Sequence, residues 1–151
     1  MGRWIGIDYG SRRIGLALGD FNHRIASPAH VLPARRPHPS NAAEIVRWAD
    51  PHEPCGFVVG MPFNMDGTSG PQADFTQAFV RALRRATRLP VETWDERLTS
   101  FQADENLATA GVSTRRGGAL RDAFAAQVML QAFLDARRAD ESSSLSEPRD
   151  V

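Results

Sequence analysis

Three apolar segments of this chain each carry a carboxylate, and that combination restricts the folds open to it. Asp8 follows the apolar run Trp4 to Ile7. Asp95 and Glu96 end a second run, and Asp122 opens a long apolar helical pattern. A charge beside apolar side chains is costly unless it is paired or coordinates a cation. We therefore expect a fold that brings the three segments together as a metal-centred acid cluster.

The N-terminal third has the pattern of three short strands. Residues 3–8 and 14–19 predict two strands joined by a turn over 9–13, and residues 24–32 predict a third. Strands joined by such short connections favour an antiparallel meander.

The remaining segments alternate between helices and strands. Ser40 is suited to cap a helix that ends near Asp50, where Pro51 prevents continuation. The later elements are expected to be a strand around 57–59, a helix from about 71 to 88, a strand over 91–95, a helix that starts near Ser100 and stops at Gly111, a basic loop over 115–118 and a buried helix over 120–134. This order predicts an α/β fold with an RNase H-like mixed sheet, in which three antiparallel strands precede alternating helices and parallel strands.

Length and composition favour one domain over residues 1–138, followed by a polar, disordered tail over 139–151. Cys55 is the single cysteine, which excludes an internal disulfide and a cysteine-based zinc site, and the 4 histidines lack metal-ligand spacing. We find neither a secretory leader nor an apolar run of membrane-spanning length. A cytoplasmic protein without a membrane partner is the expectation.

Charge alone does not identify a partner. The formal net charge is zero, yet all 18 basic residues are arginines. Arginine binds phosphate bidentately and stacks on bases, although a codon bias explains the composition equally well. The positions of the arginines in the sequence must therefore distinguish phosphate binding from codon bias.

Each carboxylate also has an ordinary structural explanation. Asp8 is suited to a turn ahead of Gly10, and Asp122 is favoured in the first turn of a helix by the helix dipole. Glu96 is free to pair with Arg97, which leaves Asp95 as the alternative ligand because neighbouring strand residues point to opposite faces. We prefer Glu96 as the ligand.

A glycine-rich loop and two arginine pairs are the candidate substrate contacts. The loop over 58–72 contains Asn64, and its backbone amides are candidates for phosphate binding, although a tight connection explains it too. Arg12 with Arg13, and Arg115 with Arg116, flank two of the acidic motifs. Together with Asn64 and Arg97, they are our candidate nucleic-acid contacts. Arg81, Arg84, Arg85 and Arg88 recur at helical spacing, which a solvated helix face also explains.

Four motifs in order resemble the YqgF/RuvX family of small RNase H-like proteins, which are related to Holliday-junction resolvases. They are DYGSRRIG (8–15), GMPFNMDGTSGPQ (60–72), DERLTS (95–100) and DAFAAQVMLQ (122–131), and they span nearly the whole chain. The resemblance implies that Asp8, Glu96 and Asp122 form an acidic metal site, with Asp95 as a further catalytic candidate. It implies two Mg²⁺ or Mn²⁺ ions, bridged by Asp8, that activate water for phosphodiester hydrolysis. The implied task is maturation of the 5′ end of pre-16S rRNA.

Other functions remain open at this stage. A Holliday-junction DNA resolvase and a non-catalytic RNA-binding or ribosome-assembly module both fit the same motifs. The first strand, turn and strand also resemble the phosphate-binding hairpin of actin-like ATPases, which need a second domain to enclose a nucleotide. The expected partners are precursor rRNA or branched DNA and ribosomal assembly particles, and the expected state is a monomer or weak dimer.

Overall fold

The N-terminal third folds as the predicted antiparallel meander. In the computed structural model, which describes residues 2–35, 37–98 and 114–146, its strands are β1 (Arg3–Tyr9), β2 (Arg13–Asp20) and β3 (Ile25–Pro33). Side chains are described throughout these ranges except at 114–120 and 139–146. β2 pairs antiparallel with both β1 and β3. The turn between β1 and β2 is closed by the amide of Gly10, which donates to the carbonyl of Arg13 at 3.0 Å.

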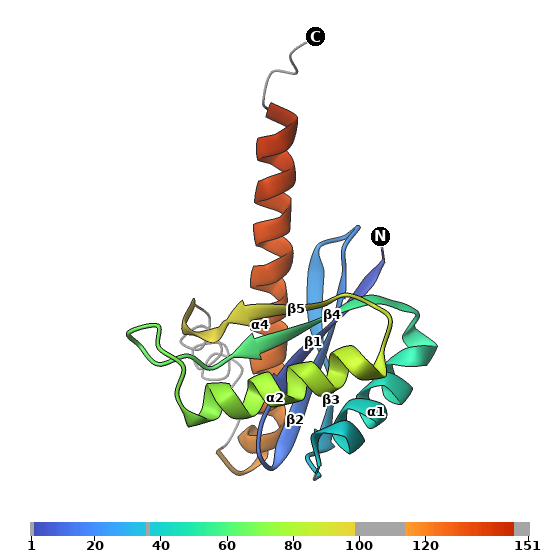
Figure 1. Cartoon of the computed structure of the whole chain (residues 1–151). Coiled ribbons are helices and arrows are strands. Elements are labelled where there is room, and N and C mark those ends of the chain that lie inside the picture. The colour runs from blue at the N-terminus through green and yellow to red at the C-terminus, as the bar shows by residue number, and fades with distance from the viewer. Residues whose placement is uncertain (1, 36, 99–113, 147–151) are drawn as a thin grey trace.

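The second half of the chain extends this meander into a mixed sheet (Figure 1). Its elements are α1 (His38–Ala49), the short helix η1 (Asp50–His52), β4 (Pro54–Met61), α2 (Pro71–Ala86), β5 (Val91–Asp95), the short helix η2 (Glu96–Leu98) and α4 (Thr114–Ser146). β4 pairs parallel with β1, and β5 pairs parallel with β4. The strand order is β3-β2-β1-β4-β5, so β1 is central and the predicted α/β class is confirmed.

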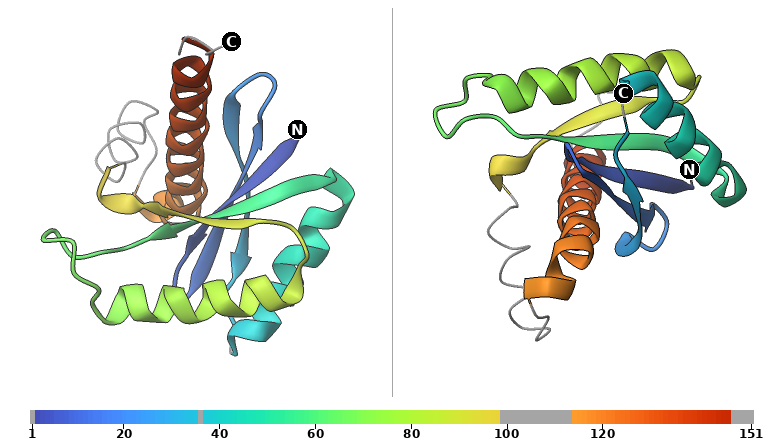
Figure 2. Two further views of the ribbon diagram at one scale, coloured as in Figure 1. Left: turned by 45° about the horizontal axis from the view of Figure 1, so that its top comes forward. Right: turned by 90° about the horizontal axis from the view of Figure 1, so that it is seen from below.

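Helices cover both faces of the sheet. α1 and α2 lie on one face and α4 crosses the other (Figure 2). Because successive strand residues point to opposite faces, Ile5, Ile7 and Tyr9 pack in the core beneath α1 and α2. The opposite face of the sheet forms a second core with α4, which includes Ala17, Val58, Ala126, Met129, Leu130, Phe133 and Leu134. Two apolar cores thus fix α4 and the α1–α2 layer against one sheet.

Two helix boundaries differ from the sequence prediction. α1 begins at His38, directly after Pro37, rather than at a cap on Ser40. Pro39 is tolerated there because the first helical turn has no internal acceptor for its missing amide hydrogen. α2 ends at Ala86, and Thr87 already has an extended backbone, so Arg88 lies beyond the helix.

The largest difference concerns α4. Residues 115–118, expected as a loop, are helical, and the helix continues past residue 139 to Ser146. Glycine lowers helix propensity without forbidding a helix, and extending a helix that is already docked on the sheet is easier than nucleating one. Pro148 is the first proline after the apolar stretch. The helix expected between Ser100 and Gly111 lies outside the described residues.

In the described part of the chain, no helix combines the length and the apolar character needed to cross a bilayer.

Candidate active site

Asp8 lies near the end of the central strand and faces α4. The side chains of Ile7 and Tyr9 point into the core beneath α1 and α2, so the alternation of β1 directs Asp8 to the opposite face. Its pairing partner on β2 is Gly15. Asp8 retains some solvent exposure, whereas its neighbours on both sides are buried. A carboxylate is thus placed at the rim of the core that the sheet forms with α4.

Glu96 reaches the same face from the far side of β4. β5 is separated from β1 by β4, so the acidic end of β5 is one strand further from Asp8 than direct neighbours would be. The gap is bridged at Gly60. A β-carbon on Gly60 would lie 2.4 Å from Oε1 of Glu96, which means that the Glu96 side chain occupies the space above this glycine.

Asp8 and Glu96 form a hydrogen-bonded carboxyl pair. Burial raises the pKa of Asp8 well above its usual range, and the charge of Glu96, its hydrogen bond and the charge of Asp122 raise it further. Burial also raises the pKa of Glu96, and the charge of Asp95 adds to this, while the hydrogen bond to Asp8 acts in the opposite direction. Two carboxyls that share a partly enclosed site hold a proton between them more readily than two negative charges. The pair therefore favours the binding of a positive charge, either a proton or a cation.

Asp122 approaches from α4, and a glycine makes this approach possible. A β-carbon on Gly15 would lie 2.0 Å from the backbone oxygen of Asp122, so α4 contacts the sheet backbone directly at this point. The Asp122 carboxylate accepts a hydrogen bond from Nε of Arg13 at 2.8 Å. Asp122 is therefore close enough to act on Asp8 electrostatically, but its carboxylate is held by Arg13.

Asp95 points away from this pair and forms an ion pair with its neighbour. Nη2 of Arg97 lies 2.6 Å from Oδ2 of Asp95, and Nε of Arg97 donates to both Asp95 oxygens. These hydrogen bonds lower the pKa of Asp95. The structure thus brings Glu96 to Asp8 and leaves Asp95 compensated by Arg97.

The loop between β4 and α2 is stabilised by its own polar groups. The amide of Asn64 donates to the carbonyl of Thr68 at 2.9 Å, and the amide of Gly67 donates to the carbonyl of Asn64 at 2.8 Å. The carboxylate of Asp66 accepts hydrogen bonds from the amide and the hydroxyl of Thr68. Nη1 of Arg97 donates to the carbonyl of Met65 at 3.3 Å. Gly67 has φ 87°, a conformation that favours glycine.

Asn64 and Arg97, both expected to contact nucleic acid, make contacts within or beside this loop. The side-chain amide of Asn64 donates to Thr68 at 3.0 Å, and Arg97 joins the loop to the end of β5. Three amides of the loop, those of Asn64, Gly67 and Thr68, already donate within it. In this structure both predicted nucleic-acid contacts build the loop beside the carboxyl pair, and these three amides are not free for phosphate.

The predicted arginine pairs are placed differently. Arg12 is exposed in the turn between β1 and β2, at the same edge of the sheet as Asp8, while Arg13 is engaged with Asp122. Arg115 and Arg116 lie in the first turn of α4, where the structure describes the backbone alone.

The oxygen atoms of Asp8, Glu96 and Asp122 are the type of ligand that a hard divalent cation prefers. Their present positions do not form a complete metal site. Within residues 2–35, 37–98 and 114–146, no three acidic, histidine or cysteine side chains are grouped closely enough to hold a metal ion. Asp8 and Glu96 supply adjacent oxygen ligands of the type that Mg²⁺ and Mn²⁺ prefer. No ion pair between described residues joins either of them to a basic side chain. Asp122 would complete the set on leaving Arg13.

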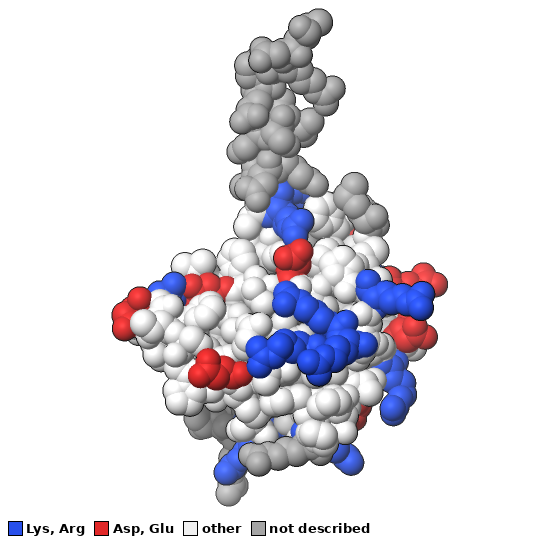
Figure 3. Space-filling model, viewed as in Figure 1, with Lys and Arg blue, Asp and Glu red and all other residues white. Residues whose placement is uncertain are grey.

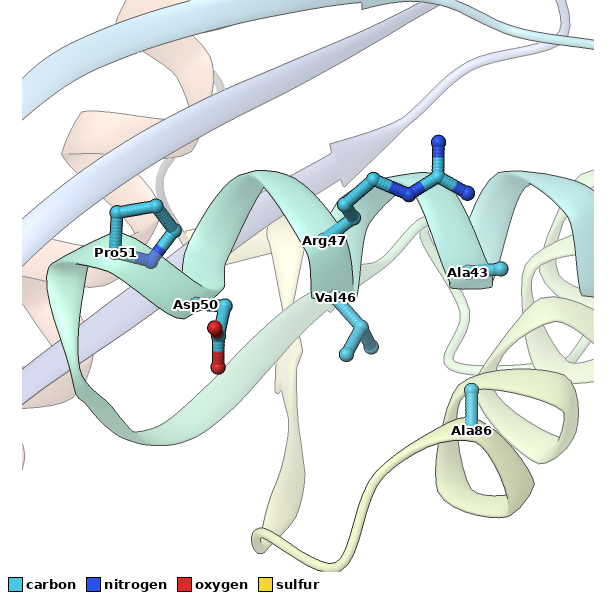
Figure 4. Close-up of a pocket in the computed structure, with 6 residues that line it drawn as sticks. All are labelled: Ala43, Val46, Arg47, Asp50, Pro51 and Ala86. Atoms are coloured by element: carbon cyan, nitrogen blue, oxygen red, sulfur yellow. The ribbon is translucent and has the colours of Figure 1, made fainter.

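A separate hollow lies on the other side of the sheet, between α1 and α2 (Figure 4). It has a volume of about 490 Å³ and is lined by Ala43, Val46, Arg47, Asp50, Pro51 and Ala86. None of these residues belongs to the carboxylate cluster, and the lining is largely apolar. We therefore place the candidate active site at the carboxyl pair.

Sequence reasoning missed the residues that open the site. Gly15 and Gly60 both lie in the quoted motifs, but the sequence analysis identified neither as the point where another group approaches the sheet closely. The available signal was glycine inside a strand, which often marks a close approach of another group.

Comparisons with known proteins show the family to which the chain belongs. The family model described as "RuvX: Holliday junction resolvase" matches residues 2–136. The chain belongs to the RuvX family. A relative from Anaeromyxobacter sp. (strain Fw109-5), named "Putative pre-16S rRNA nuclease", is 43% identical over 137 residues, which are 91% of this chain and 99% of the relative. A relative of the same name from Chloroflexus aggregans is 42% identical over 134 residues, 89% of this chain and 94% of the relative.

Solved structures show that this RuvX-family chain shares its fold with junction resolvases. RuvC of T. thermophilus, in complex with a Holliday junction substrate, superposes with a TM-score of 0.58 at 18% identity and covers 91% of this chain and 96% of its own. Fowlpox virus resolvase, bound to Holliday junction DNA, gives 0.54 at 8% identity and covers 89% and 98%. At these identities the likeness concerns the fold.

Proposed function

We propose that this chain is a metal-dependent endonuclease that hydrolyses phosphodiester bonds in precursor 16S rRNA. The observation that carries the proposal is the carboxyl pair of Asp8 and Glu96, which face each other at one end of the sheet with raised pKa values and no cationic partner among the described residues. A site of this kind is suited to binding positive charge. Membership of the RuvX family and the names of the relatives support a nuclease.

Asp8, Glu96 and Asp122 would hold the cation, with Mg²⁺ or Mn²⁺ as the candidates. Such an ion, when bound, activates water and stabilises the charge that develops on the leaving oxygen. Asp8 would supply the central ligand because it lies between the other two elements. Asp95 would act indirectly, by holding Arg97 and through it the loop beside the site.

The arginines of the site would position the substrate and compensate its negative charge. The raised pKa values of Asp8 and Glu96 make these two carboxyls more prone to hold a proton, which they would release when a cation binds. Arg13 would leave Asp122 and contact a substrate phosphate next to the site, because its exposed guanidinium sits at the rim. Arg12, in the same turn, would contact the neighbouring phosphate. Arg115 and Arg116 would approach the substrate from the first turn of α4.

Holliday-junction cleavage is the second candidate, and the fold shared with two junction resolvases favours it. A non-catalytic role in ribosome assembly is the third. The proposed setting for the first and third is the cytoplasm, with residues 1–138 acting as one domain, as a monomer or weak dimer.

A comparison of substrates tests the proposal. Purified protein would be incubated with a precursor 16S rRNA fragment, a four-way DNA junction and an unstructured RNA, each with Mn²⁺, with Mg²⁺ and with EDTA. We expect metal-dependent cuts in the precursor fragment, at a defined position, and much slower cleavage of the other two. Preferential cutting of the junction would support the resolvase, and tight binding without any cutting would support the non-catalytic module.

A further inference from the structure

A group of exposed arginines lies at the end of α2, away from the carboxyl pair. Arg81, Arg84 and Arg85 fall on the last turns of α2, and Arg88 follows just beyond the helix. At 3.6 residues per turn, the three helical positions fall within a sector of about 100°. This sector faces solvent, because the buried residues of this part of α2 are Phe79, Val80, Ala82 and Leu83. Figure 3 shows Lys and Arg side chains gathered over this half of α2. We call these four residues the α2 arginine patch.

The charge of the patch is not neutralised by the described residues. The ion pairs among them involve other arginines and His23, and none includes a member of the patch. Arg84 donates from Nη2 to the carbonyl of Val91 at 3.0 Å, a contact that holds the side chain without cancelling its charge. The protein as a whole has no net charge, so this local excess is a feature of the surface and not of the composition.

Helix stability accounts for only part of the patch. A basic side chain in the last turn of a helix interacts favourably with the dipole, which explains Arg84 and Arg85. Arg81 lies one turn earlier and is spaced i,i+3 and i,i+4 from these two like charges, an arrangement that destabilises a helix. Arg88 lies outside the helix. Helix stability therefore does not explain why four arginines are concentrated here, and a negatively charged partner would.

The patch is too far from the carboxyl pair to share one phosphate with it. Arg84 contacts Val91, the first residue of β5, whereas Glu96 follows the last residue of that strand. The four steps from Val91 to Asp95 span about 13 Å. In addition, α2 lies on the face of the sheet opposite α4.

We propose that the α2 arginine patch is a second phosphate-binding surface, which holds a duplex flank of the nucleic acid while another part of the strand enters the site. The proposal rests on the nuclease function proposed above. The partner is a phosphodiester backbone, because guanidinium groups bind phosphate oxygens bidentately. Recognition there is independent of sequence, since contacts to phosphate position a nucleic acid without reading its bases.

The proposal predicts a dependence on substrate length. At a rise of about 3.4 Å per step on one strand, 13 Å corresponds to about four base pairs, and the path around the sheet is longer. A substrate of about four nucleotides would reach the carboxyl pair alone. A hairpin with an arm of about 20 base pairs would reach both surfaces.

The test uses full-length protein and fluorescence-anisotropy binding in EDTA over a series of salt concentrations. The variant Arg81→Gln/Arg85→Gln removes two charges whose side chains form no hydrogen bond or ion pair with the described residues, and Arg81→Lys/Arg85→Lys is the control that keeps both charges at the same positions. We expect the Gln variant to bind the long hairpin at least about fivefold more weakly, with a salt slope lower by about one to two units. The Lys variant should retain most of the affinity and the slope, and the short substrate should bind equally to all three proteins.

Two results would overturn the proposal. An unchanged salt slope for the Gln variant on the long hairpin would show that the patch does not touch phosphate. An equal loss on the short and long substrates would indicate a general electrostatic effect. Thermal unfolding of each variant verifies the fold. Because binding is measured without metal, the patch is tested even if the wild type cleaves nothing, so its failure and that of the nuclease proposal are distinguishable.

Discussion

At the scale of single residues, Asp8 links stability to pH. An acid whose pKa is higher in the folded than in the unfolded protein favours folding at low pH, and this contribution is lost as pH rises from the unfolded pKa towards the folded one. Asp8 has such a raised pKa. In EDTA, the Tm of the wild type should therefore fall relative to that of Asp8→Asn as pH rises from about 4 towards neutrality. A difference in Tm that stays constant over this range would contradict the burial of an ionisable Asp8.

Glu96 and Asp95 are adjacent in sequence but face different partners. Glu96→Gln should lower the cleavage rate by more than about 100-fold, because it would remove a proposed cation ligand, whereas Asp95→Asn should cost about tenfold or less through the loosened Arg97. Both variants would be assayed on one substrate with one metal. Near-normal activity of Glu96→Gln, together with an inactive Asp95→Asn, would reverse the assignment.

In the proposed site, Arg13 would compete with a cation for the carboxylate of Asp122. Their hydrogen bond joins two partly exposed side chains, so its loss should change the free energy of unfolding by less than about 1 kcal/mol. Arg13→Gln should instead strengthen Mn²⁺ binding severalfold, which calorimetric titration of the nucleic-acid-free protein can measure. Asp122→Asn is the matched control and should weaken it. Weaker Mn²⁺ binding by Arg13→Gln would mean that Arg13 supports the site and does not block it.

At the scale of elements, two glycines determine how strands and helix meet, and their substitutions should have different effects. A β-carbon on Gly60 would meet the flexible Glu96 side chain, which is able to move, so Gly60→Ala should keep its Tm within a few degrees and lose activity. A β-carbon on Gly15 would meet the backbone of α4, so Gly15→Ala should also be destabilised, by about 1–3 kcal/mol. Thermal unfolding and cleavage assays on both variants test this. Equal Tm losses would contradict the distinction.

These elements also show how far sequence reasoning reaches. Strand alternation predicted that Asp95 and Glu96 would diverge, because that depends on neighbouring residues alone. It did not predict that Glu96 would cross above Gly60, since that contact depends on the register between strands whose residues are distant in sequence. The predicted start of α4 was wrong for a related reason. Gly117 and Gly118 locally favour a loop, while docking on the sheet favours the helix.

At the scale of the whole molecule, the carboxyl pair and the α2 arginine patch lie at opposite ends of β5. The carboxyl pair lies at the carboxyl ends of β1 and β5, while the α2 arginine patch lies at the amino end of β5. The mixed sheet, with an antiparallel meander followed by parallel strands, was predictable from the succession of elements, and the family motifs pointed to the acidic residues. The separation of the two charged regions depends on which face each helix covers, which no local pattern encodes.

Single-turnover cleavage of a precursor 16S rRNA fragment, with the wild type, Asp8→Asn and Asp95→Asn compared in Mn²⁺ and in EDTA, tests the central claim most directly. The account predicts that the wild type cuts with Mn²⁺ and not with EDTA, that Asp95→Asn stays within about tenfold of the wild-type rate, and that folded Asp8→Asn binds the RNA but cuts it several orders of magnitude more slowly. Cleavage by Asp8→Asn at the wild-type rate would contradict the assignment of the carboxyl pair as the catalytic centre.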